Sequence, residues 1–264
     1  MDICDIFKVS RFAIVILRIT FRIFRKMDKS TNIHLLLDGN SVVPCTGTVI
    51  QSSELLKEMM QFSNGDTEPI PLPSFVTKEL MQDVTSLCND SGNLSTIKSD
   101  IRYLIDLMRV TDYLAFCETT KFLLRIILGK LNTENCFEIF RLTNSAPYFN
   151  VISGASLHLM ITHLNINYQY CEYSDIFQDP YVDRYKDMSF MELQLMILNE
   201  NTGLITRISI IKNWWNHNRD GCMKEDIIAI LETINTEAAY QPKCEISLMR
   251  RIRNSMIHDI NART

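Results

Sequence analysis

From Ser74 onward, apolar residues recur at the three- and four-residue spacing of an α-helix. In the first such segment they are Val76, Leu80, Val84 and Leu87. Side chains at these intervals lie on one face of a helix, so they can be buried together. The spacing predicts helices through most of the chain, over residues 76–87, 101–108, 119–131, 135–143, 151–164, 189–197, 204–215, 224–234 and 246–257.

Two local details sharpen this prediction. Ser189 and Glu192 have the spacing of a capping box, in which each side chain bonds the backbone of the other residue. Trp214 and Trp215 are adjacent, so on a helix their side chains point about 100° apart. We therefore expect only one of the two tryptophans to be fully buried.

The region before Ser74 has a different pattern. Ile33–Leu37 and Ser41–Cys45 are short apolar runs separated by Asp38-Gly39-Asn40, and an Asp-Gly step between such runs indicates a β-hairpin. Thr48–Met60 is predicted to form a helix. Ile70–Pro73 is predicted to be extended, and its prolines suit an edge strand. Strands followed by helices predict an α+β fold.

Composition excludes several classes of protein. The chain has 264 residues, of which 46% are apolar, with only 8 Gly and 7 Pro, which excludes a disordered or low-complexity chain. Its length suits one large domain or two ordinary ones. The net charge of −4 provides no overall attraction to nucleic acid.

The charge is unevenly distributed. Residues 1–26 hold six cations and two acids, a net charge of +4, whereas the remainder carries −8. The apolar run Phe12–Leu17 is far shorter than the roughly 20 residues of a membrane-spanning helix and lacks the features of a signal peptide. Three alternatives are open for this segment: a helix packed on the protein or a partner, which we favour, a helix on a membrane surface, or a translation start at Met27.

No catalytic, cofactor or metal site is evident in the sequence. No two of the eight cysteines lie within four residues of each other, so zinc-site spacing is absent and buried reduced thiols are favoured: Cys4, Cys45, Cys88, Cys117, Cys136, Cys171, Cys222 and Cys244. His158 and His163 are five residues apart rather than three or four. Cys136 could act as a nucleophile with His158 as its base. We favour the alternative, in which both residues are buried in the core and have no catalytic role. We therefore expect that the protein is not an enzyme.

Three segments carry a resemblance to a known architecture. Ser41–Met60 resembles the strand–helix segment of BTB/POZ domains. Val110–Cys136 resembles the stretch that ends the BTB domain of kelch-like proteins, and the matching residues are Asp112, Leu114, Leu131, Asn135 and Cys136. The stretches NCFEIFRLTN and TGLITRISIIKNWWNHNRDG resemble the BACK domain, the helical extension that follows. The resemblance covers roughly residues 30–236.

This resemblance implies a domain organisation. Residues 1–29 would be the basic N-terminal helix, 30–131 a BTB/POZ domain, 132–240 a BACK-like helical bundle, and 241–264 a C-terminal helix or tail. Kelch-like proteins continue into a β-propeller, but only 28 residues follow residue 236 here, and one blade needs about 40–50. Truncated kelch-like proteins of large DNA viruses resemble this layout.

The resemblance also implies a function. We expect a cytoplasmic adaptor that links a client to a cullin-RING ubiquitin ligase. The alternative is a regulatory competitor that occupies cullin or other BTB proteins without delivering a substrate. Members of the family pair through a helix before the first strand, so we expect a homodimer that uses Phe12, Ile16, Ile19 and Ile23.

One departure from the family concerns cullin binding. Cullin-binding relatives commonly have a hydrophobic-x-Glu motif in the loop after the first long helix, where this chain reads QFSNGDTEP. The stretch IPLPSFVTKELMQDVTSLC is closer to the SCF adaptor and elongin C family. The expected cullin surface consists of Met59, Met60, Phe62, Asp66 and Tyr113. The alternative is that Met59, Met60 and Tyr113 pack inside the domain.

Overall fold

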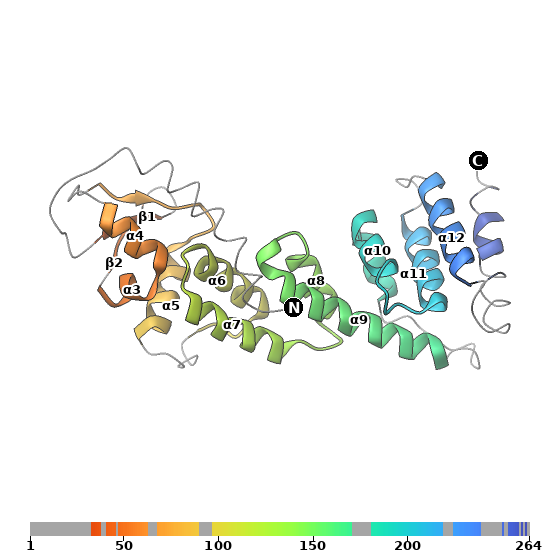
Figure 1. The fold of residues 1–264 in the computed structure, drawn as a ribbon, viewed down its shortest axis with the longest axis horizontal. Coiled ribbons are helices and arrows are strands. Elements are labelled where there is room, and N and C mark those ends of the chain that lie inside the picture. Colours follow the sequence, from red (N-terminus) through yellow and green to blue (C-terminus); the bar gives the residue numbers. More distant parts are fainter. Residues whose placement is uncertain are drawn as a thin grey trace. The chain divides into compact units, whose positions relative to one another are not determined.

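The computed structural model describes residues 33–37, 41–45, 47–62, 68–89, 97–170, 181–218, 224–238, 250, 253–258, 260 and 262. The chain divides into two compact units. The first comprises Met1–Leu131 with Thr143–Ile152, and the second comprises Asn132–Leu142 with Ser153–Thr264. Helices dominate the described residues and accompany one small sheet, so the fold is of the α+β class (Figure 1).

The sheet belongs to the first unit and has the strand order β2-β1-β3. β1 (Ile33–Leu37) and β2 (Ser41–Cys45) form the predicted antiparallel hairpin, in which Leu37 is paired with Ser41. β3 (Ile70–Pro71) pairs in parallel with β1 and lies at the edge of the sheet, as its proline predicts. Alternate residues of β1 are buried, which places one face of the sheet against the core.

Five α-helices of the first unit are described before Leu131: α3 (Gly47–Ser52), α4 (Glu54–Phe62), α5 (Lys78–Asn89), α6 (Ile101–Tyr113) and α7 (Cys117–Lys130). α6 and α7 pack against each other, and both contact α5, which also packs on α3. The predicted apolar face of α5 is buried, as are Val76 before it and Leu87 near its end. The helical spacing in this region is therefore confirmed.

The remaining helical elements are α8 (Cys136–Thr143), the 3-10 turn η1 (Pro147–Phe149), α9 (Asn150–Tyr170), the 3-10 turn η3 (Val182–Asp187), α10 (Phe190–Ile197), α11 (Leu204–His217) and α12 (Lys224–Ala238). Residues 253–258 are also helical. In the second unit, α11 contacts η3, α10 and α12. The capping box of Ser189 and Glu192 forms at the start of α10, as predicted.

The prediction for the two tryptophans is wrong, because both are buried. Trp214 and Trp215 are each 4% exposed. The Nε1–H of Trp214 donates to the carbonyl of Met188 at 2.8 Å. Since α11 is packed by η3, α10 and α12, directions that differ by about 100° both lead into the core.

Two predictions fall wholly or largely outside the described residues. They are the N-terminal helix of residues 1–29 and the first part of the helix predicted over 246–257. Among the helices that the structure describes, none is both long and apolar enough to cross a membrane.

Candidate partner-binding surface

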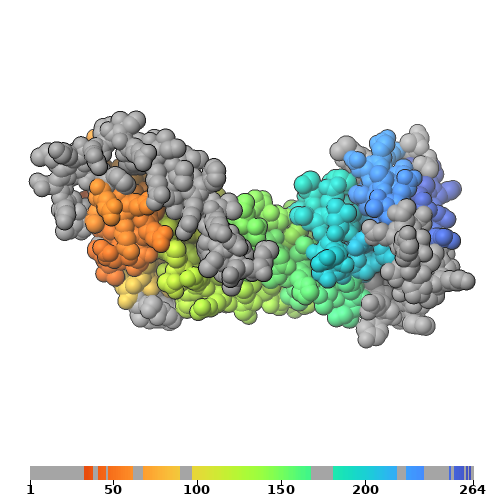
Figure 2. Space-filling view, viewed as in Figure 1, coloured from red at the N-terminus to blue at the C-terminus, as the bar shows by residue number. Residues whose placement is uncertain are grey.

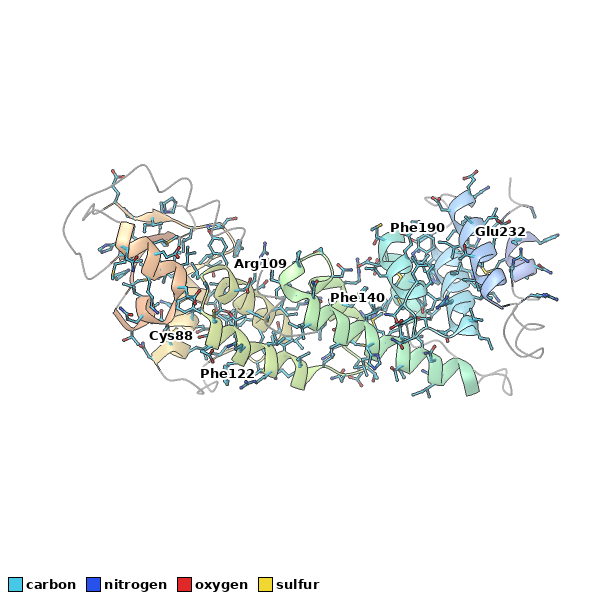
Figure 3. The ribbon with its side chains drawn as sticks, in the orientation of Figure 1. Cys88, Arg109, Phe122, Phe140, Phe190 and Glu232 are labelled. Carbon is cyan, nitrogen blue, oxygen red and sulfur yellow. The ribbon has the colours of Figure 1, made fainter. Side chains whose placement is uncertain are left out.

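Two aromatic rings and a cation meet at the C-terminal end of α6. The rings of Phe75 and Tyr113 are in edge-to-face contact, with 5.4 Å between their centroids and 85° between their planes. The guanidinium carbon of Arg109, labelled in Figure 3, lies 4.2 Å from the centroid of the Phe75 ring. Both arrangements are attractive, because the positive edge of one ring and the guanidinium each meet the negative face of a ring. We call Phe75, Arg109 and Tyr113 the aromatic cluster.

Local sequence explains how two members of the cluster come together. Arg109 and Tyr113 are four residues apart on α6, so they share one side of the helix. The opposite side of α6 is buried through Leu104, Leu107 and Met108, which leaves Arg109 exposed. Phe75 comes from the turn before α5, where the amide of Val76 donates to the carbonyl of Pro73 at 2.9 Å.

The cluster has the chemistry of a protein interface. Arg109 is exposed, while Phe75 and Tyr113 are half-buried. The phenol of Tyr113 is protonated at neutral pH and can donate a hydrogen bond, and burial raises its pKa further above the ordinary value. Aromatic residues and arginine are enriched in interfaces, because they combine large contact area with polar groups. The arrangement can therefore bind a protein partner.

Buried hydrogen bonds hold the end of α6 in place. The Thr111 hydroxyl donates to the Met108 carbonyl at 3.0 Å, and the Thr120 hydroxyl of α7 lies 3.0 Å from that of Thr111. The Phe116 amide donates to the Thr111 carbonyl at 2.8 Å. Ala115 has φ of 56°, a left-handed backbone that lets the chain turn sharply between the two helices. These contacts fix the backbone that carries Tyr113.

The residues predicted from the sequence have different outcomes. Met59 is only 6% exposed and packs in the core, the alternative that the sequence left open, so it offers little area to a partner. Met60 is half-buried. The side chain of Phe62 and all of Asp66 lie outside the described residues. The predicted dimer contacts also fall outside the described part of the chain: Phe12, Ile16, Ile19 and Ile23.

Sequence reasoning missed Phe75 and Arg109. The spacing of four between Arg109 and Tyr113 was a usable signal, because it places both side chains on one side of a predicted helix. Phe75 had no comparable signal. Its contact with α6 joins residues more than 30 positions apart, and it depends on how α5 and α6 pack.

Cys136 does not have the environment of a nucleophile. It is buried, and burial raises the pKa of its thiol, whereas a reactive cysteine needs a thiolate with access to substrate. Its Sγ lies 3.2 Å from the hydroxyl of Tyr181, which donates to the Thr133 carbonyl at 2.9 Å and lies 3.1 Å from Nδ1 of His163. His158, the imagined base, is exposed. The geometry is that of a hydrogen-bonded core around Tyr181.

The described His, Cys, Asp and Glu side chains form no second candidate site. Within the described residues, no group of three or more His, Cys, Asp and Glu side chains is arranged to hold a metal ion. The four described cysteines are free thiols: Cys45, Cys88, Cys117 and Cys136. The first and last of these are buried, and the other two are half-buried. The aromatic cluster is therefore the best-supported candidate site.

Comparison with known proteins provides no family for this chain. A scan against protein-family models finds no match, and a search of the curated proteins finds no significant match. The BTB and BACK identities suggested by the residues therefore stay predictions.

Asp112, next to the cluster, is expected to make stability depend on pH. Burial raises the pKa of its carboxyl to about 6, above its usual value near 3.8. The folded protein therefore holds this proton up to higher pH than the unfolded chain, and stability falls as pH rises from about 4 to above 6. We expect Asp112→Asn to raise the free energy of unfolding by about 1–2 kcal/mol at pH 7, after allowance for solvent screening, and to have little effect near pH 4.

Urea unfolding of wild type and variant at both pH values measures this effect. Glu68→Gln, which neutralises an exposed carboxyl of the same unit, is the control and should leave the pH dependence unchanged. An Asp112→Asn protein whose stability follows pH as the wild type does contradicts the prediction.

Proposed function

We propose that this protein is a non-catalytic adaptor of the BTB type, in which the first unit recruits a cullin and the second is a BACK-like helical domain. The observation that carries this proposal is the aromatic cluster. Tyr113, which the sequence assigned to a partner surface, is half-buried and lies in a cluster with Phe75 and an exposed Arg109. Partner-binding residues of this type usually lie where a rigid element supports them.

The cluster can provide binding energy without rearrangement. Its rings are already in contact, and Arg109 already lies over a ring face, so little side-chain entropy is lost when a partner covers them. The exposed guanidinium also offers donors to a partner carbonyl or carboxylate. We expect the cullin surface to combine Phe75 and Arg109 with the residues predicted earlier, Met60, Phe62, Asp66 and Tyr113.

The other parts of the proposal follow the resemblance. The N-terminal residues Phe12, Ile16, Ile19 and Ile23 form the contact of a homodimer. The second unit connects the BTB-like unit to a client, and the complex acts in the cytoplasm. All described elements of the second unit are helical, as expected for a BACK-like domain.

Removal of the exposed arginine tests the cullin surface. We expect Arg109→Ala to weaken binding of a purified cullin N-terminal region by about 1–3 kcal/mol. The substitution removes both an arginine that would anchor the partner and its cation–π contact with the ring of Phe75. Tyr113→Ala should have an effect of similar size. Calorimetric titration measures both, and melting temperatures show whether the variants stay folded.

Arg125→Ala is the matched control, since Arg125 is an exposed arginine on α7. It should bind cullin as the wild type does. Equal losses in all three variants contradict the assigned surface. If the wild-type protein does not bind cullin, the adaptor proposal is wrong. The alternative is then a regulatory protein that occupies other BTB proteins without delivering a substrate.

A further inference from the structure

Helix α10 of the second unit has apolar residues on two opposite faces. Leu193, Met196 and Ile197 are at most 1% exposed and pack in the core. The other face carries Met191, Leu195 and, at the C-cap directly after the helix, Leu198, which are 68%, 46% and 66% exposed. We call these three residues the outer stripe.

The outer stripe is a continuous line along the helix. Its residues are spaced by four and three, so they lie one above the other over about 10 Å. A helix with apolar residues on two opposite faces is normally covered on both of them. In the space-filling view the cyan atoms of α10 reach the surface of the molecule (Figure 2). The described residues therefore leave one apolar face of this helix uncovered.

An ion pair between Arg141 and Glu192 lies beside the outer stripe. Nε of Arg141, from α8, is 3.3 Å from the Glu192 carboxylate, and their side chains are 40% and 11% exposed. The same carboxylate accepts the backbone amide of Ser189 at 2.7 Å, which fixes its position. Glu192 lies about 100° around the helix from Met191, so the ion pair is on one flank of the outer stripe.

The size of the outer stripe limits what can cover it. Three side chains that are half to two-thirds exposed present on the order of 300 Å² of apolar surface, whereas a stable interface buries roughly 800 Å² on each partner. A second copy of the whole chain would need a much larger surface. A single helix laid along the stripe needs only three or four apolar anchors.

We propose that the outer stripe is a docking site for a short amphipathic helix of a partner protein. Its apolar residues recur at i, i+4 and i+7, and an acidic residue on one flank reaches Arg141. Leu195 lies at the centre of the stripe and is its main anchor. The site is separate from the aromatic cluster, so its failure and the failure of the cullin proposal are distinguishable.

A synthetic peptide tests this proposal on the full-length protein. The peptide is an acetylated 14-residue helix former with Leu at positions 3, 7 and 10, Glu along one flank and Lys elsewhere. The protein carries ¹³C-methyl methionine, with signals assigned through Met191→Leu and Met196→Leu. We expect the peptide to shift the Met191 methyl signal, while that of Met196, buried on the same helix, moves far less.

Matched variants locate the contact. Leu195→Glu should weaken binding at least about tenfold, because it places a charge at the centre of the stripe. Ile166→Glu replaces a residue of similar exposure, 49%, on α9 and should bind as the wild type does. A peptide with Lys on the flank in place of Glu should bind a few-fold more weakly, because Lys cannot accept a hydrogen bond from the guanidinium of Arg141, whose charge Glu192 already offsets.

Three results would overturn the proposal. The first is no shift of the Met191 signal at about 1 mM peptide, the weakest affinity that such a contact would have. The second is equal binding of a scrambled peptide in which the leucines no longer share a face. The third is a dimer, seen by light scattering, that Leu195→Glu dissociates, because a second copy would then occupy the stripe.

Discussion

Replacement of Trp214 by alanine is expected to lower the free energy of unfolding of the second unit by about 3–5 kcal/mol. The indole is 4% exposed, and its ring centroid lies 5.9 Å from that of Phe190. Its Nε1–H also donates to the Met188 carbonyl, which ties α11 to the start of α10. Alanine removes the buried area and the hydrogen bond, and it leaves a cavity that the surrounding helices fill only in part.

Urea unfolding followed by tryptophan fluorescence measures this loss. Both tryptophans of the chain lie in α11, so the remaining signal of Trp215 reports on the second unit. Trp214→Phe retains a ring but not the donor and should cost about 1–2 kcal/mol. Lys212→Ala, an exposed change in the same helix, should stay within about 0.5 kcal/mol. A loss below about 1 kcal/mol for Trp214→Ala would show that the site is not a packed core.

Ser53→Ala is expected to lower the free energy of unfolding of the first unit by about 2–3 kcal/mol, because one buried hydroxyl makes two hydrogen bonds. It donates to the carbonyl of Leu114 and accepts from the amide of Leu56 at 2.9 Å. Ser53 is fully buried, so water cannot replace either bond. The variant therefore leaves a buried carbonyl and a buried amide without this partner.

Urea unfolding followed by far-ultraviolet circular dichroism measures the effect. Ser52→Ala is the matched control: this hydroxyl is exposed and donates to the Thr48 carbonyl within the same turn, so its loss should cost less than about 0.5 kcal/mol. Similar losses in the two variants would contradict a special role for Ser53. A large loss in Ser53→Ala alone supports the bonds between the α3–α4 junction and the end of α6.

Ser53 also shows where sequence reasoning about the fold ends. The apolar pattern of Thr48–Met60 predicts one helix, yet the structure has α3 and α4 with Ser53 between them. The apolar spacing passes through the break, so periodicity alone cannot reveal it. The break depends on a partner 61 residues away, the carbonyl of Leu114, to which Ser53 bonds, while the Glu54 amide donates to Ala115.

The candidate site was predictable only in part, for a similar reason. The sequence assigned Tyr113 to a partner surface, and the structure adds Phe75 and Arg109 as its neighbours. Met59 belongs to the same apolar pattern as Met60, but it lies on the side of α4 that faces the core. Spacing shows which residues share a helix face, but it does not show which face meets solvent near another element.

The sequence by itself determined the features that neighbouring residues control. The hairpin of β1 and β2, the edge position of β3, the buried face of α5 and the capping box of α10 depend on contacts within a few residues or on one repeating pattern. These features depend on local backbone geometry, which a short segment of the sequence is enough to specify.

Only the tertiary structure decided the break at Ser53, the burial of both tryptophans, the raised pKa of Asp112 and the aromatic cluster. Each depends on which helices pack together, because burial, desolvation and ring contacts are set by atoms far away in the sequence. The sequence of a helix such as α11 does not show how many neighbouring elements pack against it. The number of its buried faces therefore follows only from the tertiary structure.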